Sequence, residues 1–363
     1  MEKMWQSEEM SLTQQELVRY SRHLVLPNFN EEHQLKLKKA KVLVIGAGGL
    51  GVPVLQYLTA AGVGSIGIVD ADMVDESNLQ RQVLYTENDI GKNKAELAKK
   101  SLEQLNGNVN FTVYPIRLTS SNALEIAKNY DVIVDGTDNF ASRYLINDTA
   151  VILNKPLVYG SIHRFEGQVA VFNYKNGPNY RDLFPVPPNP NDVPNCEEGG
   201  VLGVLPGIIG SMQANEAIKI LTQISEPLSE KLFLFNALNM SSYTLEIEKD
   251  INQNKITALI DYDEFCGAAQ NNLTISLEEF QQLRKGAFQL IDVREAYEYE
   301  EYNIGGKLIP LGEIEQHLDK IEKDNLVVIH CKTGARSSKA VDLLVKQYDY
   351  QNIRSLAANL MEV

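Results

Sequence analysis

Residues 46–51 of this chain are Gly46-Ala47-Gly48-Gly49-Leu50-Gly51, a glycine-rich stretch whose flanks show where it lies in the fold. The apolar run at 41–45 predicts a buried parallel strand, and residues 50–61 have the apolar spacing of a helix. A glycine turn between strand and helix lets backbone N–H groups and the positive helix end approach a phosphate closely. A second strand is expected at 65–69, and Asp70 at its end is placed to accept hydrogen bonds from a ribose. The pattern predicts a doubly wound α/β domain with a mostly parallel sheet that binds a dinucleotide or ATP.

Side chains after the second expected strand favour ATP over a dinucleotide. Arg81 offers a planar fork of donors and Lys94 a compact point charge, a pair suited to phosphates whose negative charge moves toward a leaving pyrophosphate. Asn78 can add a neutral donor. A further strand, expected at 131–135, is followed by Asp138, whose carboxylate suits Mg²⁺ bound to phosphate oxygens.

Composition limits the class of protein. A length of 363 residues suggests two domains, and 44% hydrophobic residues are enough for a normal core. A formal net charge of −14 argues against nucleic acid as a bulk electrostatic partner. Residues 1–10 are polar and acidic, and the longest apolar run, 201–209, is interrupted by glycine and proline, so we expect neither a secretory signal nor a membrane span. The 3 cysteines are widely separated and make no disulfide framework, which indicates a cytoplasmic protein.

A second, smaller α/β domain is expected at 273–363, after a first domain at 1–250 and a linker at 251–272 that is rich in Asn, Asp and Gln. Its apolar run at 326–330 predicts a buried strand, and the loop that follows is Cys331-Lys332-Thr333-Gly334-Ala335-Arg336. A cysteine between a strand and a helix N-terminus is close to the helix dipole and to backbone N–H donors, which favour the thiolate. Cys331 is therefore a candidate nucleophile.

The ordered motifs between residues 12 and 248 resemble the MoeB/ThiF branch of the ubiquitin-activating-enzyme superfamily. The shared motifs are Arg19-Tyr20-Ser21-Arg22-His23, Gly46 to Gly51, Asp70, Ser77 to Gln82, Lys94, Gly136-Thr137-Asp138-Asn139, Gly200 to Gly207 and Gln213 to Ala217. Members of this family adenylate the C-terminal glycine of a small ubiquitin-like sulfur carrier protein that ends in Gly-Gly. They consume ATP and release pyrophosphate.

The resemblance also implies roles for single residues. Asp70 resembles the ribose ligand, and Asp138 resembles the catalytic carboxylate associated with Mg²⁺. Arg22 resembles the arginine that reaches into the partner subunit's site, which implies a homodimer. The ATP-binding set that the resemblance implies is Gly46, Gly48, Gly49, Gly51, Asp70, Asn78, Arg81, Lys94, Asp138 and Asn139.

Residues 273–363 resemble a rhodanese domain, in which the loop cysteine carries a persulfide. The resemblance implies that Cys331 receives sulfur from a donor such as a cysteine desulfurase or thiosulfate, and that Arg294 and Glu295 form a supporting turn. Related phosphatases have one more residue between cysteine and arginine, so this loop is sized for sulfur. Cys196 resembles the crossover-loop cysteine of sulfurtransferase-fused relatives, and a covalent acyl link and a structural role both stay open for it.

Relatives hold a structural zinc with two Cys-x-x-Cys pairs. The matching positions here are Asn179 and Asp182, then Asp263 and Cys266. One thiolate with a carboxamide and carboxylates is a poor ligand set for tetrahedral zinc. We expect the structural zinc to be absent and Cys266 to be a small packed residue.

Two functions from other classes use part of the same pattern. A nicotinamide-dependent oxidoreductase would need the same glycines, but it leaves residues 77–82 and Lys94 unexplained. A non-catalytic scaffold that binds a carrier's tail would leave Asp138 and Arg81 idle. Within the enzyme interpretation, the carrier's pathway stays open among molybdopterin, thiamin and tRNA thiolation.

Overall fold

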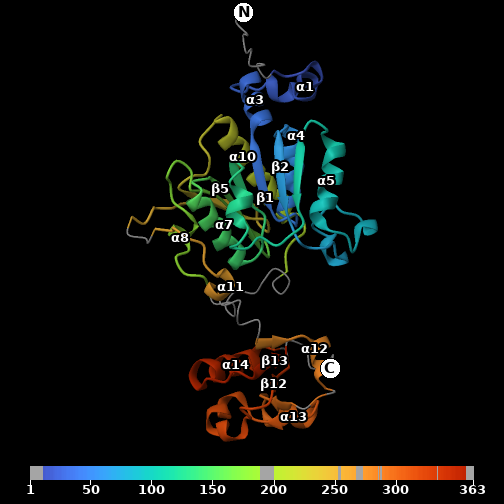
Figure 1. Ribbon diagram of the computed structural model, residues 1–363, viewed down its shortest axis with the longest axis vertical. Coiled ribbons are helices and arrows are strands. Elements are labelled where there is room, and N and C mark those ends of the chain that lie inside the picture. The colour runs from blue at the N-terminus through green and yellow to red at the C-terminus, as the bar shows by residue number, and fades with distance from the viewer. Residues whose placement is uncertain are drawn as a thin grey trace, which may run out of the picture. The chain divides into compact units, whose positions relative to one another are not determined.

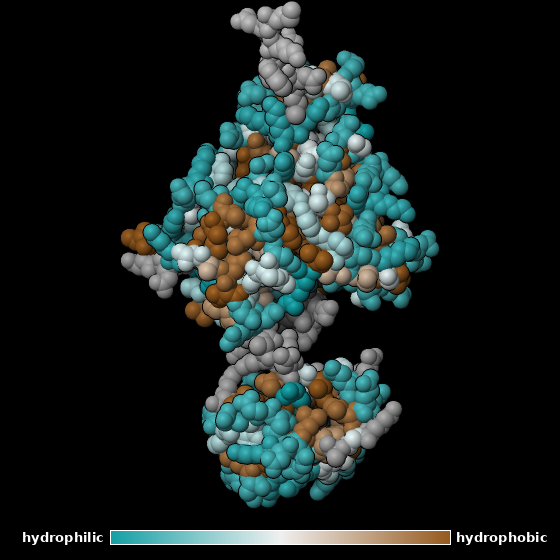
Figure 2. Space-filling model, in the orientation of Figure 1, coloured by the Kyte–Doolittle hydropathy of each residue, from teal (hydrophilic) through white to brown (hydrophobic). Residues whose placement is uncertain are grey.

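The computed structural model describes residues 11–188, 200–251, 255–266, 273–284, 286, 288–332 and 334–356. The chain divides into two compact units, Met1–Cys266 and Gly267–Val363 (Figure 1). The visible face of each unit is mostly hydrophilic, with patches of apolar residues between the polar ones (Figure 2). Within the described residues, no helix has the length and apolar character needed to cross a membrane.

An 8-stranded mixed sheet forms the centre of the first unit, in the order β3-β2-β1-β4-β5-β6-β7-β8. The strands from β3 to β5 are parallel, and β6, β7 and β8 add antiparallel pairs at one side. The mostly parallel α/β fold that the sequence predicts is therefore confirmed. The strands are β1 Lys41–Ile45, β2 Ser65–Val69, β3 Asn110–Tyr114, β4 Val132–Asp135, β5 Leu157–His163, β6 Glu166–Phe172, β7 Lys231–Asn236 and β8 Ser241–Glu246.

Helices cover both faces of this sheet. In β1, Val42 and Val44 belong to one buried apolar cluster and Leu43 and Ile45 to another, so successive side chains enter two separate core layers. A parallel strand buried on both faces needs this continuous apolar sequence. The helices are α1 Gln14–Arg19, α2 Ser21–Leu24, α3 Glu31–Lys39, α4 Gly51–Ala61, α5 Lys94–Leu105, α6 Ala123–Ala127, α7 Phe140–Ile152, α8 Tyr180–Leu183, α10 Leu205–Thr222 and α11 Tyr262–Phe265, with short 3₁₀ helices at Glu76–Asn78 and Glu87–Asp89.

Helix α10 begins at Leu205, whereas the sequence pattern suggests a start near Gly210. Pro206 lies in the first turn, where a proline is tolerated because its missing N–H would have no intrahelical partner. A Cβ added to Gly210 would lie 2.4 Å from the Pro53 side chain, so this glycine lets α10 pack closely on α4. The glycines and the proline that obscure the helix in the sequence are thus accommodated within it.

The segment expected as a linker, 251–272, contains part of the first unit. Helix α11 lies within it and contacts α7, and the first unit extends to Cys266. Tyr262 and Cys266 are 4% and 6% exposed. These two buried side chains fix the stretch to the first unit, although its polar composition alone suggests a solvent-exposed linker.

The second unit is a 5-stranded sheet in the order β11-β10-β12-β13-β9, with parallel neighbours throughout. Ser276 caps α12, as the sequence suggests, and accepts a hydrogen bond from the Glu279 N–H. The strands are β9 Thr274–Ile275, β10 Gln289–Asp292, β11 Lys307–Leu308, β12 Val327–His330 and β13 Ile353–Leu356; the helices are α12 Leu277–Leu283, α13 Ala296–Glu301, η4 Leu311–Lys320 and α14 Ala335–Tyr348.

Candidate active sites

A cleft of about 270 Å³ opens at the carboxyl ends of β1, β2 and β4 in the first unit. Side chains at this edge of a doubly wound sheet are those that face a bound ligand. Gly51 and Asn78 do not line the cleft. The other members of the ATP-binding set do line it: Gly46, Gly48, Gly49, Asp70, Arg81, Lys94, Asp138 and Asn139.

The glycines of the turn serve different purposes. Gly46 has φ +95°, and a Cβ there would lie 2.7 Å from the Gly136 carbonyl oxygen, so a side chain would strain the backbone and clash with β4's end. A Cβ on Gly51 would overlap the Gly46 carbonyl oxygen, so Gly51 lets α4 pack against the turn. Gly48 and Gly49 line the cleft at the start of α4, where N–H groups lack intrahelical acceptors. The turn therefore presents backbone donors at the floor of the cleft.

Asp70 both faces the cleft and holds the glycine turn. Its Oδ2 accepts a hydrogen bond from the Ala47 N–H at 2.7 Å, and its Oδ1 accepts one from the Asp72 N–H at 2.8 Å. Burial raises the pKa of Asp70, while these hydrogen bonds oppose that shift. Each carboxylate oxygen keeps a further lone pair, which could accept a ribose hydroxyl.

Arg81 and Lys94 are two of the four cationic residues that line the cleft, together with Arg117 and Arg143. Lys94 is 6% exposed, and its Nζ lies 3.2 Å from Oδ2 of Asp72, a carboxylate that the sequence analysis did not identify. Arg81 Nη1 donates to the Ser77 carbonyl at 2.9 Å, which leaves the rest of its fork available. The signal for Asp72 was its position two residues after Asp70, at the end of the same strand. Asp72 holds Lys94 in place by an interaction that a phosphate can replace.

Asp138 and Asn139 follow β4. Asn139 caps α7, because its Oδ1 accepts a hydrogen bond from the Ser142 N–H at 2.9 Å. Asp138 is exposed, and its carboxylate has no hydrogen bond or ion pair with any residue that the structure describes. An exposed carboxylate beside a phosphate site suits a hard cation such as Mg²⁺.

The sequence analysis did not identify two buried charged residues near Asp138, namely Asp135 and Arg143. Asp135 is 1% exposed, and its Oδ1 accepts hydrogen bonds from the Thr137 N–H at 2.8 Å and hydroxyl at 2.6 Å. Burial raises the pKa of Asp135, and the positive charge of Arg143 opposes that shift. Arg143 stacks against the rings of Phe140 and Tyr159, each centroid 5.6 Å away. Arg143 therefore places a fixed positive charge in the cleft wall.

Arg22 lies away from the cleft of its own chain. It is an exposed residue of α2, and the preceding Tyr20 accepts a hydrogen bond from Asn106 Nδ2 at 2.9 Å. Arg19 donates to the Leu105 carbonyl at 3.0 Å. Leu105 and Asn106 are at the end of α5, just before β3, so these contacts fix α1 and α2 at the amino ends of the strands (Figure 1). The cleft is at the opposite edge of the sheet.

The second candidate site is the loop between β12 and α14. Cys331 is 2% exposed, and the Ser337 N–H donates to its Sγ at 3.5 Å. Gly334, at the N-cap of α14, has φ +86° and gives the loop its sharp turn. Lys332 is exposed. Thr333 and Cys196 lie outside the described residues.

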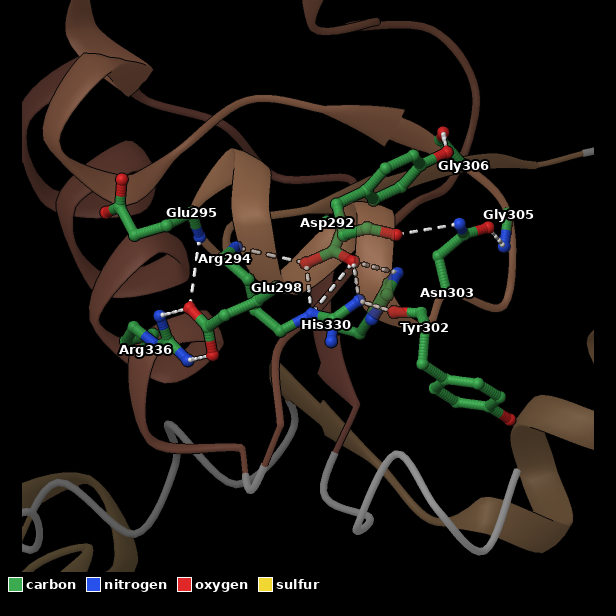
Figure 3. Close-up of polar contacts among 11 residues, drawn as sticks. Asp292, Arg294, Glu295, Glu298, Tyr302, Asn303, Gly305, Gly306, His330 and Arg336 are labelled. Atoms are coloured by element: carbon green, nitrogen blue, oxygen red, sulfur yellow. Dashed lines mark hydrogen bonds and ion pairs between the residues drawn. The ribbon is translucent and has the colours of Figure 1, made fainter.

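Arg336 at the end of the loop is bound by Glu298 on α13 (Figure 3). The two N–H···O bonds measure 2.6 and 2.7 Å, a bidentate arrangement that fixes the guanidinium plane. These bonds lower the pKa of Glu298 to about 2. Arg336 is thus held in one orientation in the first turn of α14, the helix that follows Cys331.

A second arginine, Arg294, binds Asp292 and the Tyr302 backbone, as Figure 3 shows. Arg294 Nη2 donates to Asp292 Oδ2 at 2.6 Å and to the Tyr302 carbonyl at 2.7 Å. The buried His330, directly before Cys331, has Nε2 3.8 Å from Oδ2 of Asp292, and burial lowers the pKa of this histidine. Arg294 therefore joins β10 to the segment after α13. Its hydrogen bonds among the described residues go to Asp292 and Tyr302, and none goes to the sulfur loop.

The four positions that match the relatives' zinc ligands have other partners. Asn179 Nδ2 donates to Asp182 Oδ2 at 2.8 Å, and Asp263 pairs with Arg117 at 2.8 Å. Cys266 is buried, and burial raises the pKa of its thiol to about 11. Within the described ranges, no three His, Cys, Asp or Glu side chains are grouped so as to hold a metal. These residues do not fit a zinc ion.

An ion pair with aromatic walls lies in this region instead. Arg181 Nε and Nη2 donate to the two oxygens of Asp148, each at 2.8 Å, and the Tyr262 hydroxyl donates to Asp148 Oδ2 at 2.6 Å. The guanidinium carbon is 5.0 Å from the Tyr144 ring centroid and 4.6 Å from that of Phe265. We call these five residues the Arg181 clamp. It joins α7, α8 and α11.

Comparison with known proteins gives matches to both units. The family model described as "ThiF family" matches residues 20–256, and that described as "Rhodanese-like domain" matches residues 276–361. "Probable adenylyltransferase/sulfurtransferase MoeZ" of Mycobacterium tuberculosis is 47% identical over 353 residues, which cover 93% of this chain and 90% of that protein. "Sulfur carrier protein adenylyltransferase" of Thermus thermophilus is 51% identical to this chain. The matched residues cover 71% of this chain and 99% of that protein.

Solved structures show the same fold. The crystal structure of E. coli MccB with ATP superimposes with a TM-score of 0.58, covering 66% of this chain and 73% of that one. Sequence identity is 22%, so the likeness concerns the fold alone.

Proposed function

Because this chain belongs to the ThiF family and continues into a rhodanese-like domain, we propose that it adenylates the C-terminal glycine of a small ubiquitin-like sulfur carrier protein and then supplies sulfur to that glycine. It is an enzyme with an adenylyltransferase and a sulfurtransferase domain. The name of the Thermus thermophilus relative supports a sulfur carrier as the substrate.

The arrangement of the cleft carries the proposal. Lys94 and Arg81 lie beside the glycine turn, and an exposed carboxylate, Asp138, faces them from the end of β4. In the proposed reaction the carrier's carboxylate attacks the α-phosphorus of ATP, the bond to pyrophosphate breaks, and an acyl-adenylate forms. Lys94 and Arg81 offset the charge that moves onto the leaving pyrophosphate. Asp70 orients the ribose.

Asp138 would hold Mg²⁺ together with phosphate oxygens, and the ion would add positive charge at the leaving group. The exposure of this carboxylate supports that role. Arg143 lies in the cleft wall, and its positive charge offsets the negative charge of the neighbouring buried Asp135.

A homodimer is part of the proposal because of the place of Arg22. The β1 strand separates the amino edge, where α2 is fixed, from the cleft at the carboxyl edge, and its five residues span about 16 Å. An arginine side chain cannot cover that distance and also pass around the sheet. We infer that Arg22 serves the cleft of a partner subunit.

Cys331 is the proposed persulfide carrier. Its sulfur lies before the N-terminus of α14, where the helix dipole and loop N–H groups favour an anion. The outer sulfur of the persulfide attacks the carbonyl carbon of the acyl-adenylate, AMP leaves, and an acyl disulfide joins the carrier to Cys331. Two equivalents of a thiol reductant then cleave the disulfides: the first releases the carrier thiocarboxylate, and the second frees Cys331 as a thiolate. Sulfur reaches Cys331 from a cysteine desulfurase or from thiosulfate. For Cys196 the proposal keeps both roles, acyl carrier and loop residue.

The test is ATP–pyrophosphate exchange measured with recombinant carrier proteins ending in Gly-Gly, one from each of the three pathways. We expect one carrier to stimulate exchange, and Asp138→Ala and Arg81→Ala to lose nearly all of it, because both residues act on charge that develops at the phosphates. Glu125→Ala, an exposed carboxylate on α6 paired with Lys128, is the matched control and keeps the full rate. Retention of more than about a tenth of the rate in both cleft variants would remove them from the site.

A further inference from the structure

Two buried hydroxyl groups lie behind the sulfur of Cys331. Ser337 on α14 is 0% exposed, and Ser355 on β13 is 1% exposed. The Ser355 hydroxyl donates to Ser337 Oγ at 2.8 Å, and Ser337 Oγ lies 3.7 Å from Cys331 Sγ. The sulfur is therefore contacted from inside the domain by a hydroxyl that has a second hydroxyl behind it.

Strand pairing places Ser355 there. In the parallel register of β12 and β13, Ser355 pairs with Ile329, two residues before Cys331. The surrounding layer is apolar and includes Ile329, Val341 and Ile353. A hydroxyl in such a layer is costly unless it is hydrogen-bonded, so the two serines satisfy each other beside the sulfur.

The hydrogen bonds of Ser337 can change with the charge of the sulfur. Its single hydroxyl proton goes to the Gly334 carbonyl at 2.9 Å, while its oxygen accepts from Ser355. A neutral thiol can donate its own proton to Ser337 Oγ. When the sulfur is an anion, rotation of one C–O bond turns the Ser337 proton from the carbonyl to Sγ. Ser355 continues to donate in both states.

We propose that Ser337 and Ser355 form a hydroxyl relay that stabilises negative charge on Cys331 Sγ, with Ser337 in contact with the sulfur and Ser355 as a positioning residue. The inference rests on the proposed role of Cys331 as persulfide carrier. When cyanide or a thiol attacks the sulfur atom that is bonded to Sγ, the S–S bond breaks and its electron pair stays on Sγ, which becomes a thiolate. The relay donates to this charge as it develops, and the Ser355 donation makes Ser337 a stronger donor.

Other charged or titratable groups lie on the loop or next to it, and Arg336 interacts electrostatically with Cys331. They are Arg336 on α14 with its partner Glu298 on α13, Lys332 and His330 beside Cys331 in the chain, and the Asp292–Arg294 pair below the loop. The serine substitutions leave all of these groups in place. A change in the reactivity of the thiol can then be assigned to the hydroxyls.

The experiment is the pH dependence of Cys331 alkylation in the full-length chain, freed of persulfide sulfur with dithiothreitol. Iodoacetamide labelling of the peptide that contains Cys331 is quantified by mass spectrometry, so the other cysteines do not interfere. We expect Ser337→Ala to raise the midpoint of the profile by about 1 pH unit, and Ser355→Ala by about half of that. Ser355→Thr keeps a hydroxyl and restores the wild-type midpoint.

The double variant is the sharpest measurement. Because Ser355 acts through Ser337, Ser337→Ala with Ser355→Ala should shift the midpoint no further than Ser337→Ala alone. The control is Ser241→Ala, an exposed serine at the start of β8 in the first unit, with an expected shift under about 0.2 unit. Additive shifts, or an unchanged midpoint in Ser337→Ala, would overturn the relay.

Folding and the proposed function are checked separately. Each Ser→Ala substitution removes one oxygen atom, and circular dichroism verifies the fold of every variant. If Ser337→Ala fails that check, Ser355→Ala against Ser355→Thr decides. Thiosulfate:cyanide transfer by the wild type against Cys331→Ala tests the persulfide role by itself. A failed transfer assay with shifted alkylation profiles contradicts the persulfide role alone, and the reverse contradicts the relay alone.

Discussion

Replacing Arg181 with methionine removes the cation at the centre of the Arg181 clamp and keeps much of its length. Asp148 is 2% exposed and would lose two charge-assisted hydrogen bonds of 2.8 Å. Breaking a buried ion pair on one side costs about 3–5 kcal/mol, because the remaining charge stays buried without its partner. Tyr262 and Asn147 still donate to Asp148 and the Arg181 side chain is 14% exposed, so the low end, about 3 kcal/mol, applies here.

For a unit of this size that loss corresponds to a melting temperature lower by about 6–12 °C. The measurement is calorimetry of the full chain, following the transition of the first unit. The double variant Arg181→Met with Asp148→Asn should recover part of the loss, because it no longer buries an unpaired charge. Lys128→Ala, which breaks an exposed pair with Glu125, is the control and changes stability by about 0.5 kcal/mol or less.

Calorimetry with and without a chelator also tests whether the protein holds a structural zinc ion. If the clamp does the work of the zinc in relatives, a chelator leaves the wild-type melting temperature unchanged, and elemental analysis finds much less than one zinc per chain. The reasoning fails if Arg181→Met melts within about 2 °C of the wild type, or if the chelator destabilises the protein.

Three further predictions concern the two active sites and their pH dependence. Mixing inactive Arg22→Ala with inactive Asp138→Ala subunits should restore pyrophosphate exchange through hybrid dimers; a mixture that stays inactive, with subunit exchange verified by mass, would remove Arg22 from the partner's site. Cys331→Ala should abolish thiosulfate:cyanide transfer and keep pyrophosphate exchange, whereas Cys196→Ala should keep both and slow thiocarboxylate formation only if it carries an acyl intermediate. The pKa of Glu298 is lowered from 4.5 to about 2, so its ion pair stabilises the second unit above pH 4.5 and is lost as the pH falls toward 2. The melting temperature of Glu298→Gln should therefore lie below the wild type's at pH 6 and approach it at pH 2, and a constant difference would contradict this.

Much of the fold follows from local pattern. The apolar runs predict β1, β2 and β4 within a residue of their observed bounds, because a parallel strand buried on both faces has no other composition. The glycine turn between β1 and α4 also locates the cleft, because the glycines that line it are recognisable in the sequence. Gly46 and Gly51 are required by the backbone itself, and that requirement is visible as glycine in the sequence.

Residues that act through distant partners could not be predicted. Asp72, Arg143 and Ser355 belong to no motif, and their partners become visible only when the chain folds. Ser355 meets Ser337 across the boundary between β13 and α14, and Lys94 meets Asp72 from the start of α5. The segment around α11 was expected as a linker, since its polar residues outnumber the two buried side chains that fix it. Spacing along the chain reports local geometry, whereas these contacts depend on sheet order.

The order of strands in the second unit has a consequence for synthesis. β9, formed by Thr274–Ile275, pairs with β13, formed by Ile353–Leu356. The first strand of this unit can therefore pair only after the last strand has been synthesised. A ribosome delivers the chain from the N-terminus, and domains generally fold as units once their residues have emerged. The sulfur loop is made earlier, but the hydroxyl of Ser355 reaches Ser337, the residue in contact with Cys331, only after β13 joins β12. A nascent chain that stops before Ile353 would contain the cysteine and all its charged neighbours, and would still lack the strand that completes the sheet behind it.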